Sequence, residues 1–276
     1  MIVQMRRMGV EDIEAGLRLC RAAGWNQLDG DWRVFLRSNP AGCRVAVEDG
    51  EVVGTVTTMR FDDRFSWISM LLVDPAYRGR GIGTALLTEA LRVLEDMPCV
   101  RLDASPAGKA VYERSGFATE YGLVRMRALA VTPGRSDGVR PMEERDIEAV
   151  DDLDLEAFGA RRRMVLNHLR SSAPEYAFVA EVKGEIAGYV VGRRGFLAPQ
   201  IGPVVARDAR MAAALVSACG GSGSVIDVPE DDAEWLRWLE AAGFRRERPF
   251  TRMFLGDVPE FGQPKLQFAI AGPEFG

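Results

Sequence analysis

Histidine and cysteine are both scarce in this chain, and their scarcity limits the kinds of site it can build. The 276 residues include one histidine, His168, and four cysteines, which are Cys20, Cys43, Cys99 and Cys219. The cysteines show no paired spacing, so the sequence indicates neither a disulfide framework nor a zinc site. We therefore expect no bound metal, buried thiols in a reducing compartment, and a structural or surface role for His168.

An excess of positive charge and long apolar runs are also lacking. Lys and Arg number 35 against 40 Asp and Glu, a net charge of −5, whereas nucleic-acid-binding domains are usually basic. No apolar run reaches the roughly 20 residues of a membrane-spanning helix, and the N-terminal run is too short for a signal peptide. We expect a cytoplasmic protein with neither a nucleic-acid nor a membrane partner, and the acidic balance favours a cationic or amine-bearing small partner.

The length is that of two ordinary domains, and internal repeats support this division. The segment Asp12–Ala15 recurs at Asp146–Ala149 and Gly50–Val52 recurs as Gly184–Ile186, both at a shift of 134 residues. The Gly-Phe pair that ends at Phe117 recurs at Phe244. Such ordered repeats predict two copies of one fold. We place the copies at residues 1–132 and 139–255, with a linker at 133–138 and an extension at 256–276. In the extension, Leu266–Ala271 is either an extended segment across the domain junction or part of a frayed tail.

The most informative stretch lies in the first copy, where a strand leads into a glycine-rich turn. The apolar run Ile68–Val73 predicts a buried strand, and the periodicity of Ala85–Leu94 predicts a helix. Gly79, Gly81 and Gly83 lie between them. The first N–H groups of a helix have no partner inside it, and glycines let a backbone curl around an anion. The pattern therefore predicts a phosphate or pyrophosphate cradle, unless the glycines merely start a helix.

The spacing of this turn separates it from other phosphate loops. It lacks the Gly-Lys-Ser/Thr end of a P-loop and the G-x-G-x-x-G of a dinucleotide fold. Arg78-x-x-Gly81-x-Gly83, after a strand that ends at Val73, resembles the Q/R-x-x-G-x-G/A acyl-CoA motif of the GNAT (Gcn5-related N-acetyltransferase) family. The resemblance implies that acetyl-CoA is the co-substrate. It places the pyrophosphate on the backbone N–H groups of residues 79–84 and the pantetheine amides beside the strand. The implied contacts are Leu72, Val73, Arg78, Gly79, Arg80, Gly81, Ile82, Gly83 and Thr84.

The order of predicted elements also matches that family over residues 1 to about 130. Strands are expected at 3–6, 43–48, 52–60, 68–73, 99–104 and 123–129, and helices at 10–23, 29–36, 85–94 and 107–114. The fold class predicted is α/β (α+β), with two tandem GNAT-like domains. Each would have a mixed, mostly antiparallel central sheet flanked by helices.

Two further segments resemble functional parts of GNAT enzymes. Tyr112 lies on the helix after the fifth strand, where a GNAT tyrosine faces the CoA sulfur. A phenol can protonate the departing thiolate at neutral pH, so Tyr112 is the predicted catalytic acid, although a half-buried structural tyrosine would look the same. Trp25 and Asn26 lie in the loop that borders the acceptor in GNATs and are predicted substrate contacts, although a core tryptophan is the alternative.

The base that deprotonates the acceptor amine is not evident from the sequence. The strand Trp67–Leu72 contains no carboxylate, whereas many GNATs hold a glutamate there. Asp62 or Asp63, at the entrance of that strand, could serve, but aspartates in turns are commonly turn formers.

The second copy lacks the residues that mark the first. A gap-free alignment of the helices places Arg207, Arg210 and Ala212 opposite Arg78, Gly81 and Gly83, and places Leu239 opposite Tyr112. We therefore predict that the first copy is catalytic and the second is degenerate, because the second copy lacks both the phosphate-binding loop and the catalytic acid. Arg194, Arg207 and Arg210 could form another anion site, but such arginines are more commonly solvated.

The resemblance implies an N-acetyltransferase that moves acetyl from acetyl-CoA to an amine by direct attack in a ternary complex. The rival hypothesis is a non-catalytic acyl-CoA sensor, and the retention of Tyr112 favours the enzyme. A small-molecule amine is favoured over a protein as the acceptor. The sequence leaves the acceptor and the oligomeric state open.

Overall fold

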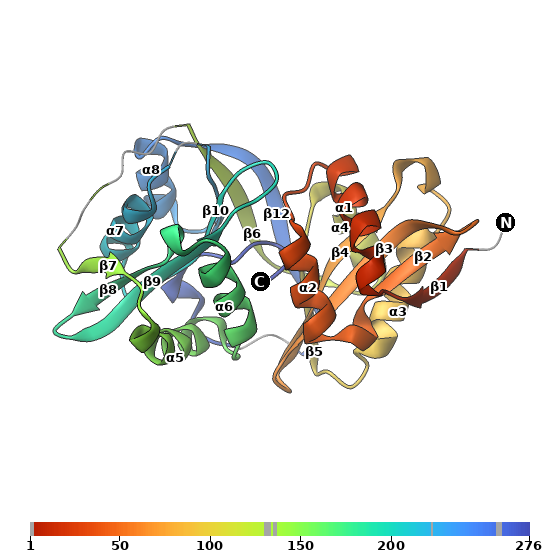
Figure 1. The fold of residues 1–276 in the computed structure, drawn as a ribbon, viewed down its shortest axis with the longest axis horizontal. Coiled ribbons are helices and arrows are strands. Elements are labelled where there is room, and N and C mark those ends of the chain that lie inside the picture. The colour runs from red at the N-terminus through yellow and green to blue at the C-terminus, as the bar shows by residue number, and fades with distance from the viewer. Residues whose placement is uncertain (1–2, 130–133, 135–136, 222, 258–260) are drawn as a thin grey trace.

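The computed structural model describes residues 3–129, 134, 137–221, 223–257 and 261–276 (Figure 1). Parts of the predicted linker, at 133, 135 and 136, lie outside these residues. The first half contains β1 Gln4–Arg7, α1 Ile13–Ala22, α2 Asp29–Ser38, β2 Arg44–Glu48, β3 Glu51–Phe61, β4 Phe65–Val73, α3 Ile82–Val93, β5 Cys99–Ala104, α4 Pro106–Arg114 and β6 Ala118–Ala128. The second half contains β7 Val139–Pro141, α5 Ile147–Phe158, α6 Arg163–Ser172, β8 Phe178–Val182, β9 Glu185–Arg193, β10 Gln200–Ala206, α7 Ala209–Cys219, β11 Val225–Pro229, α8 Ala233–Ala241, β12 Phe244–Gly256 and β13 Gln267–Ala269.

The predicted fold class is confirmed, and the elements of the two halves follow the same order. A polar motif repeats with them. Arg6 forms two hydrogen bonds of 2.7 Å with Asp12, whose carboxylate also accepts from the N–H of Gly9 at 2.8 Å. Arg140 and Asp146 repeat the pair at 2.7 and 2.8 Å. The two copies therefore fix the chain in the same way between their first strand and first helix.

The two halves exchange their last long strands. The described strands form one sheet in the order β1-β2-β3-β4-β5-β12-β6-β11-β10-β9-β8-β7, with β13 beside β10. β12, from the second half, pairs antiparallel with β5, and β6, from the first half, pairs antiparallel with β11. β12 and β6 also pair with each other, so they cross the middle of the molecule together (Figure 1). The sequence predicts one sheet for each copy, and the structure joins the two sheets into one.

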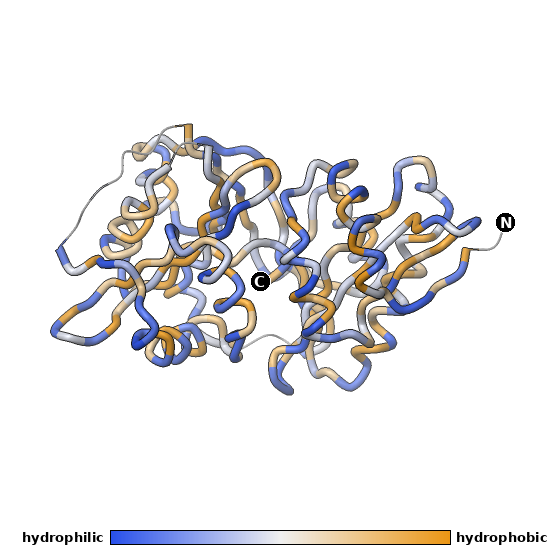
Figure 2. The backbone as a smooth tube through the Cα atoms, in the orientation of Figure 1, coloured by the Kyte–Doolittle hydropathy of each residue, from blue (hydrophilic) through white to orange (hydrophobic). Residues whose placement is uncertain are grey.

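Alternating side chains of the strands supply cores on both faces of the sheet. In β4, Trp67 packs into the core that includes residues of α1, α2, α5 and α6, whereas Ile68 packs into the core beneath α3. The first of these cores is shared by the two halves. The turn between β3 and β4 is hydrophilic, as the hydropathy colours show at the lower edge of the first half (Figure 2). Burial thus follows the period-two pattern of the strands, and one core ties the halves together.

The end of the chain is ordered and buried. β13 pairs antiparallel with β10 of the second half, so residues 267–269 of the Leu266–Ala271 run form a strand rather than a frayed tail. Beyond it, Phe275 stacks on Phe35 of α2, with ring centroids 5.1 Å apart. The chain therefore ends between the halves (Figure 1). Among the described residues, no helix combines the length and the apolar character needed to span a bilayer.

Candidate active site

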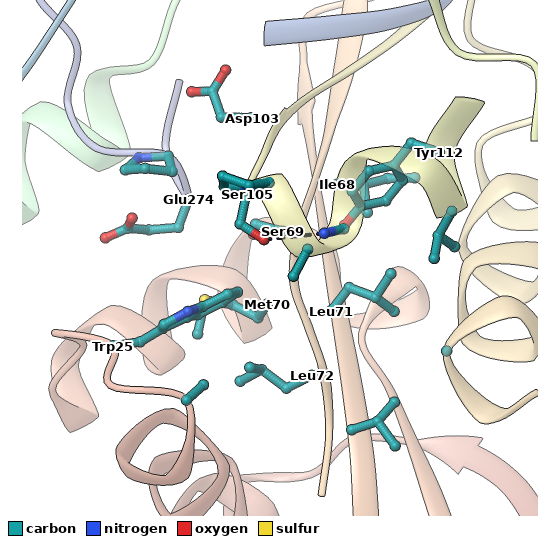
Figure 3. Close-up of a pocket in the computed structure, with 18 of the residues that line it drawn as sticks. Trp25, Ile68, Ser69, Met70, Leu71, Leu72, Asp103, Ser105, Tyr112 and Glu274 are labelled. Atoms are coloured by element: carbon teal, nitrogen blue, oxygen red, sulfur yellow. Dashed lines mark hydrogen bonds between the residues drawn. The ribbon is translucent and has the colours of Figure 1, made fainter. Parts of the chain in front are cut away.

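A gap opens between β4 and β5 in the first half. These parallel strands pair at Ser66 with Val100 and at Trp67 with Arg101, and the pairing stops there. The edge of β4 beyond Trp67 therefore faces a cavity of about 810 Å³, whose lining includes Ile68–Val73 (Figure 3). A strand edge without a partner offers backbone donors and acceptors to an extended ligand. The predicted contacts Leu72 and Val73 both lie on this edge.

A β-bulge shapes the same edge. Thr57 pairs with Ser69 and Thr55 with Leu72, so Met70 and Leu71 together lie opposite the single residue Val56. Met70 has φ of 51°, a left-handed conformation that is uncommon away from glycine. The hydroxyl of Thr55 donates to the carbonyl of Met70 at 2.8 Å and holds the bulge in place. Bulges of this kind re-aim backbone groups beside active sites.

The glycine-rich loop closes one end of the cavity. Gly79 and Gly81 have φ of 76° and 78°, and no other atom lies within 4 Å of a Cβ built on either. The glycines are needed for their backbone conformation rather than for space within the protein. Within the described chain, the N–H groups of residues 79–84 have no acceptor, and the first bonded one is Ala85, which donates to Gly81 at 3.0 Å. These unbonded groups stand at the positive end of α3, which suits an anion.

The two arginines of the loop have different surroundings. Arg78 lines the cavity, and its Nε donates to the carbonyl of Val73 at 3.3 Å. Arg80 turns away, because its guanidinium pairs with Glu48 at 2.9 Å and is not among the groups that line the cavity. The contact implied for Arg80 is through its backbone N–H, which stays a prediction, and its side chain is engaged by Glu48.

Tyr112 lies across the gap from the loop, on α4. Ser105 caps this helix by accepting from the N–H of Gly108 at 3.3 Å, and the ring of Tyr112 packs edge-on against Phe117 at 5.8 Å. Burial raises the pKa of the Tyr112 hydroxyl, which keeps it protonated and able to donate. Within the described residues this hydroxyl has no hydrogen-bond partner. Figure 3 shows Tyr112 on the cavity wall beside Ile68.

Trp25 and Asn26 both line the cavity, but they differ in what their side chains contact. Trp25 is half-buried beside Met70 (Figure 3). The amide of Asn26 is directed into the second half instead. It donates to the carbonyl of Ala198 at 2.9 Å and accepts from the N–H of Leu197 at 2.8 Å. Asn26 thus joins the two halves, and a substrate contact for either residue stays a prediction.

Two carboxylates line the described part of the cavity, Asp103 and Glu274. Both oxygens of Asp103 accept from Arg252, at 2.8 and 2.9 Å. Glu274 comes from the buried end of the chain. Asp62 and Asp63 lie in the turn before β4, at the far end of that strand, and Asp62 accepts from the N–H of Arg161 at 3.0 Å. The suggestion that Asp62 or Asp63 is the base is therefore wrong.

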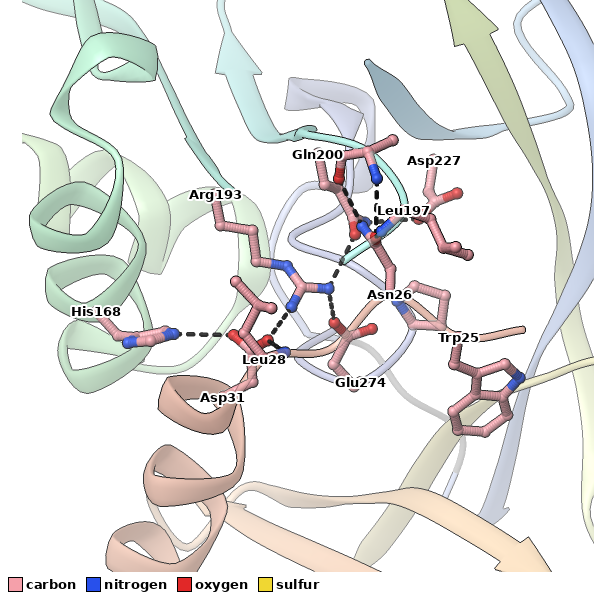
Figure 4. A network of polar contacts seen from close by, with 12 residues as sticks. Trp25, Asn26, Leu28, Asp31, His168, Arg193, Leu197, Gln200, Asp227 and Glu274 are labelled. Atoms are coloured by element: carbon pink, nitrogen blue, oxygen red, sulfur yellow. Dashed lines mark hydrogen bonds and ion pairs between the residues drawn. The ribbon is translucent and has the colours of Figure 1, made fainter. Parts of the chain in front are cut away.

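Glu274 belongs to a buried network that links the halves (Figure 4). The guanidinium of Arg193 bonds to Asp31, Glu274 and Gln200. His168 contacts Asp31 at 2.9 Å, so its role is structural, as predicted. Burial raises the pKa of Glu274, partly against the effect of Arg193. A carboxylate with a raised pKa is a better proton acceptor than an ordinary one.

Sequence reasoning missed Glu274, and it also missed three residues that the strand exchange brings to the cavity. These are Arg125 from β6 and Arg248 and Phe250 from β12. No local motif marks them, because the positions of β6 and β12 beside the cavity depend on long-range strand pairing. The one local signal is the apolar run at 266–271, from which the sequence leaves a packed segment and a frayed tail equally open.

The second half differs from the first at the corresponding places. Arg207 and Asp208 alone join β10 to α7, and the Asp208 carboxylate accepts from the N–H of Met211 at 2.8 Å. Arg210 lies within α7, so the alignment of Arg210 with Gly81 is wrong and Asp208 occupies the cap position. β10 and β11 pair only at residues 200–201 and 225–226 before they separate, and β13 lies against β10 where they part. A strand of the chain itself thus occupies the place that is open in the first half.

Comparisons with known proteins agree with the repeated fold. Residues 12–117 match the model of the Acetyltransferase (GNAT) family, and residues 150–265 match that of an Acetyltransferase (GNAT) domain. Holothin acyltransferase of a Pseudoalteromonas species is 28% identical over 261 residues, which cover 92% of this chain and 88% of that protein. YitH of Bacillus subtilis, an uncharacterized N-acetyltransferase, is 23% identical and covers 88% of each chain. A crystal structure from Pyrococcus horikoshii, provisionally assigned as an acetyltransferase, superposes with a TM-score of 0.85 at 24% identity, over 99% of this chain and 96% of that one.

Proposed function

Because this chain belongs to the GNAT family of acyltransferases and carries one of its domains in each half, we propose that it transfers an acetyl group from acetyl-CoA to an amine. The observation that carries the proposal is the β4–β5 gap beside a loop whose N–H groups have no acceptor in the part of the chain that the structure describes. A pyrophosphate needs such donors, and a pantetheine arm needs such a strand edge.

The residues of the first half fit acetyl-CoA. The N–H groups of Gly79 to Thr84 would hold the pyrophosphate, with Arg78 beside it. The edge of β4 at Leu72 and Val73 would bind the amides of the pantetheine arm. Acetyl-CoA supplies an activated acetyl thioester and a thiolate leaving group.

The mechanism follows from what the cavity presents. Glu274 takes a proton from the acceptor ammonium, because an amine attacks only through a free lone pair. Backbone N–H groups at the Met70 bulge would stabilise the oxygen on which negative charge develops. As the C–N bond forms and the C–S bond breaks, the Tyr112 hydroxyl would donate its proton to the departing sulfur. The second proton of the acceptor nitrogen would then restore the phenol. Direct attack on the bound thioester, without an acyl-enzyme, completes the proposal.

Only the first half is proposed to bind acetyl-CoA. The Asp208 carboxylate occupies the start of α7, where it would repel a phosphate. β13 fills the strand gap, and Leu239 is fully buried in the position that Tyr112 has in the first copy. The second half would instead complete the acceptor side of the cavity.

The acceptor is proposed to be a small molecule rather than a protein. Trp25, Arg248 and Pro273 line the cavity from three different segments, so the acceptor side is bounded by both halves and by the end of the chain. A cytoplasmic location is part of the same proposal. The alternative, a sensor that only binds acyl-CoA, leaves the half-buried, protonated Tyr112 without a role.

Calorimetry with acetyl-CoA, followed by a screen of small amines with a thiol-release readout, tests the proposal. One binding site per chain and amine-dependent release of CoA are expected. Two sites, or no binding, would overturn the assignment of the first half. Binding without release for any amine would favour the sensor.

A further inference from the structure

On the acceptor side of the cavity wall, Arg248 has no carboxylate partner among the described residues. Arg248 of β12 lines the cavity, and among the described residues no carboxylate lies within 4.0 Å of its guanidinium. Its Nε is buried without an acceptor. Two other arginines of the same strand pair with carboxylates, since Arg252 binds Asp103 at 2.8 Å and Arg246 lies 3.3 Å from Glu230. Arg245 of this strand is exposed and donates to backbone carbonyls. Among the described residues, Arg248 is therefore the arginine of β12 that lines the cavity without a carboxylate partner.

A second arginine lies directly beside it. Arg248 is opposite Arg125 in the ladder between β12 and β6. The two guanidinium carbons lie 5.0 and 5.4 Å from the centre of the Phe250 ring. Arg125 is neutralised by Asp227, with hydrogen bonds of 2.8 and 2.7 Å. Like charges on directly opposite residues destabilise a sheet. The pKa of Arg248 is lowered by its burial and by the positive charge of Arg125. An anion bound at Arg248 would relieve this repulsion.

The tail side of the cavity carries the opposite imbalance. Asp31 and Glu274 share the single guanidinium of Arg193, with His168 also against Asp31. Near Arg193, carboxylates therefore outnumber guanidinium groups by one. Glu274 is the member of this group that lines the cavity. Among the described residues, the acceptor side thus presents a cation without a carboxylate partner on β12 and the carboxyl group of Glu274 on the tail.

This arrangement complements a zwitterion. We infer that the acceptor is an amine that also carries a carboxylate, with its carboxylate on Arg248 and its amine facing Glu274. A guanidinium binds a carboxylate through two parallel hydrogen bonds, which makes it the preferred partner for this group. The inference rests on the proposed acetyl transfer for the identity of the amine, but the anion site itself can be tested by binding.

The binding test uses matched pairs of small molecules on the full-length protein in the presence of CoA. Ligand-observed NMR titrations would compare 4-aminobutyrate with butylamine, and phenylalanine with phenethylamine. The carboxylate member should bind about 10- to 100-fold more tightly, the range of a charged hydrogen-bonded contact. Arg248→Gln should remove this difference and leave the affinity for the plain amines unchanged. Arg248→Lys should keep part of it.

Arg245→Gln is the matched control, because Arg245 is an exposed arginine on the same strand that bonds to backbone carbonyls outside the cavity. This variant should leave the affinity for both members of each pair unchanged. A phosphoethanolamine and ethanolamine pair shows whether phosphate is preferred. Equal binding of acids and amines, an unchanged preference in Arg248→Gln, or a stronger preference for phosphate would overturn the inference.

Turnover of the same compounds separates this inference from the proposed function. Suppose that plain amines and amino acids are acetylated with equal kcat/KM and bind equally well. The proposed acetyltransferase activity would then stand, and the proposed carboxylate site would be refuted. Tight, Arg248-dependent binding of the amino acids without acetylation would support the anion site and contradict the proposed reaction.

Discussion

The indole N–H of Trp67 donates a hydrogen bond of 3.0 Å to the carbonyl of Pro273, 206 residues further along the chain. Trp67 is the last residue of β4 that pairs with β5, and Pro273 lines the cavity next to Glu274. The end of the chain is therefore anchored at the point where the strand gap opens. This contact places the proposed base across the cavity from the proposed acid, although the two come from opposite ends of the sequence.

Gly81→Ala should weaken acetyl-CoA binding at least tenfold. A side chain at φ of 78° costs about 1–2 kcal/mol, which favours a loop conformation with misdirected N–H groups. Gly50→Ala is the control, because Gly50 has φ of 85°, open surroundings and a position in the β2–β3 turn. Calorimetry and thermal unfolding should show a similar loss of stability in both variants but a loss of binding in Gly81→Ala alone. Equal acetyl-CoA affinities would contradict the role of the loop.

Tyr112→Phe should lower kcat by about 10²–10⁴-fold while the affinity for acetyl-CoA stays nearly constant. A general acid acts in the transition state, so its loss affects turnover rather than binding. Tyr176→Phe, a tyrosine of the second half outside the cavity, should have no effect. Steady-state kinetics measure both variants, and full activity in Tyr112→Phe would mean that the ring only packs.

Glu274→Gln should remove the acidic limb of the pH profile of kcat/KM. Burial raises the pKa of Glu274 above the ordinary value of 4.5, so in the wild type the rate should rise with pH above that value as the carboxylate ionises. The variant should be slower by about 10²–10⁴-fold and lose this limb. Its acetyl-CoA affinity and thermal unfolding show whether the fold is retained. An unchanged profile would assign the limb to another group.

Asp31→Asn should destabilise the protein by about 3–5 kcal/mol, because it removes one partner of a buried ion pair. Asp29→Asn, which breaks only an exposed pair with Arg33 on the same helix, should cost less than about 0.5 kcal/mol. Urea unfolding of both variants measures the difference, and equal costs would mean that the Arg193 network contributes little.

The effect of Asp31 should also depend on pH. Burial alone would raise the pKa of Asp31, but Arg193 and His168 outweigh it and hold the pKa below 3.8. The folded state therefore binds the proton less tightly than the unfolded state. The stabilisation is complete above pH 3.8 and is lost as the pH falls through the folded value. The gap in stability between wild type and Asp31→Asn should narrow in that range, and a constant gap would contradict this assignment.

A fragment of residues 1–132 should not form a stable monomer. It lacks β12, which pairs with β5, and β11, which pairs with β6. Co-expression with residues 134–276 should restore a soluble complex that binds acetyl-CoA. Size-exclusion chromatography and calorimetry test this, and a monodisperse fragment 1–132 with full affinity would show that the exchange is dispensable.

The sequence was most informative where the physics is local. The strand before the glycine turn, the turn itself and the helix that carries Tyr112 depend on neighbouring residues, and all could be predicted. The exchange of β6 and β12 could not be predicted. The alternation of apolar and polar residues in Ala118–Ala128 is the same whether this strand pairs with β5 or with β11. Glu274 and Arg248 reach the cavity only through that exchange and through β13. The acceptor side was therefore predicted less completely than the cofactor side.

The exchange also sets the order in which the protein can fold during synthesis. β5 and β6 leave the ribosome first, and residues 129–243 must follow before β12 appears. At about 5–20 residues per second, these 115 residues take roughly 6–23 s. Throughout that interval β5 has an unpaired edge, the kind of surface on which nascent chains aggregate. The first half begins to form early, but its sheet is completed only when nearly the whole chain has been made.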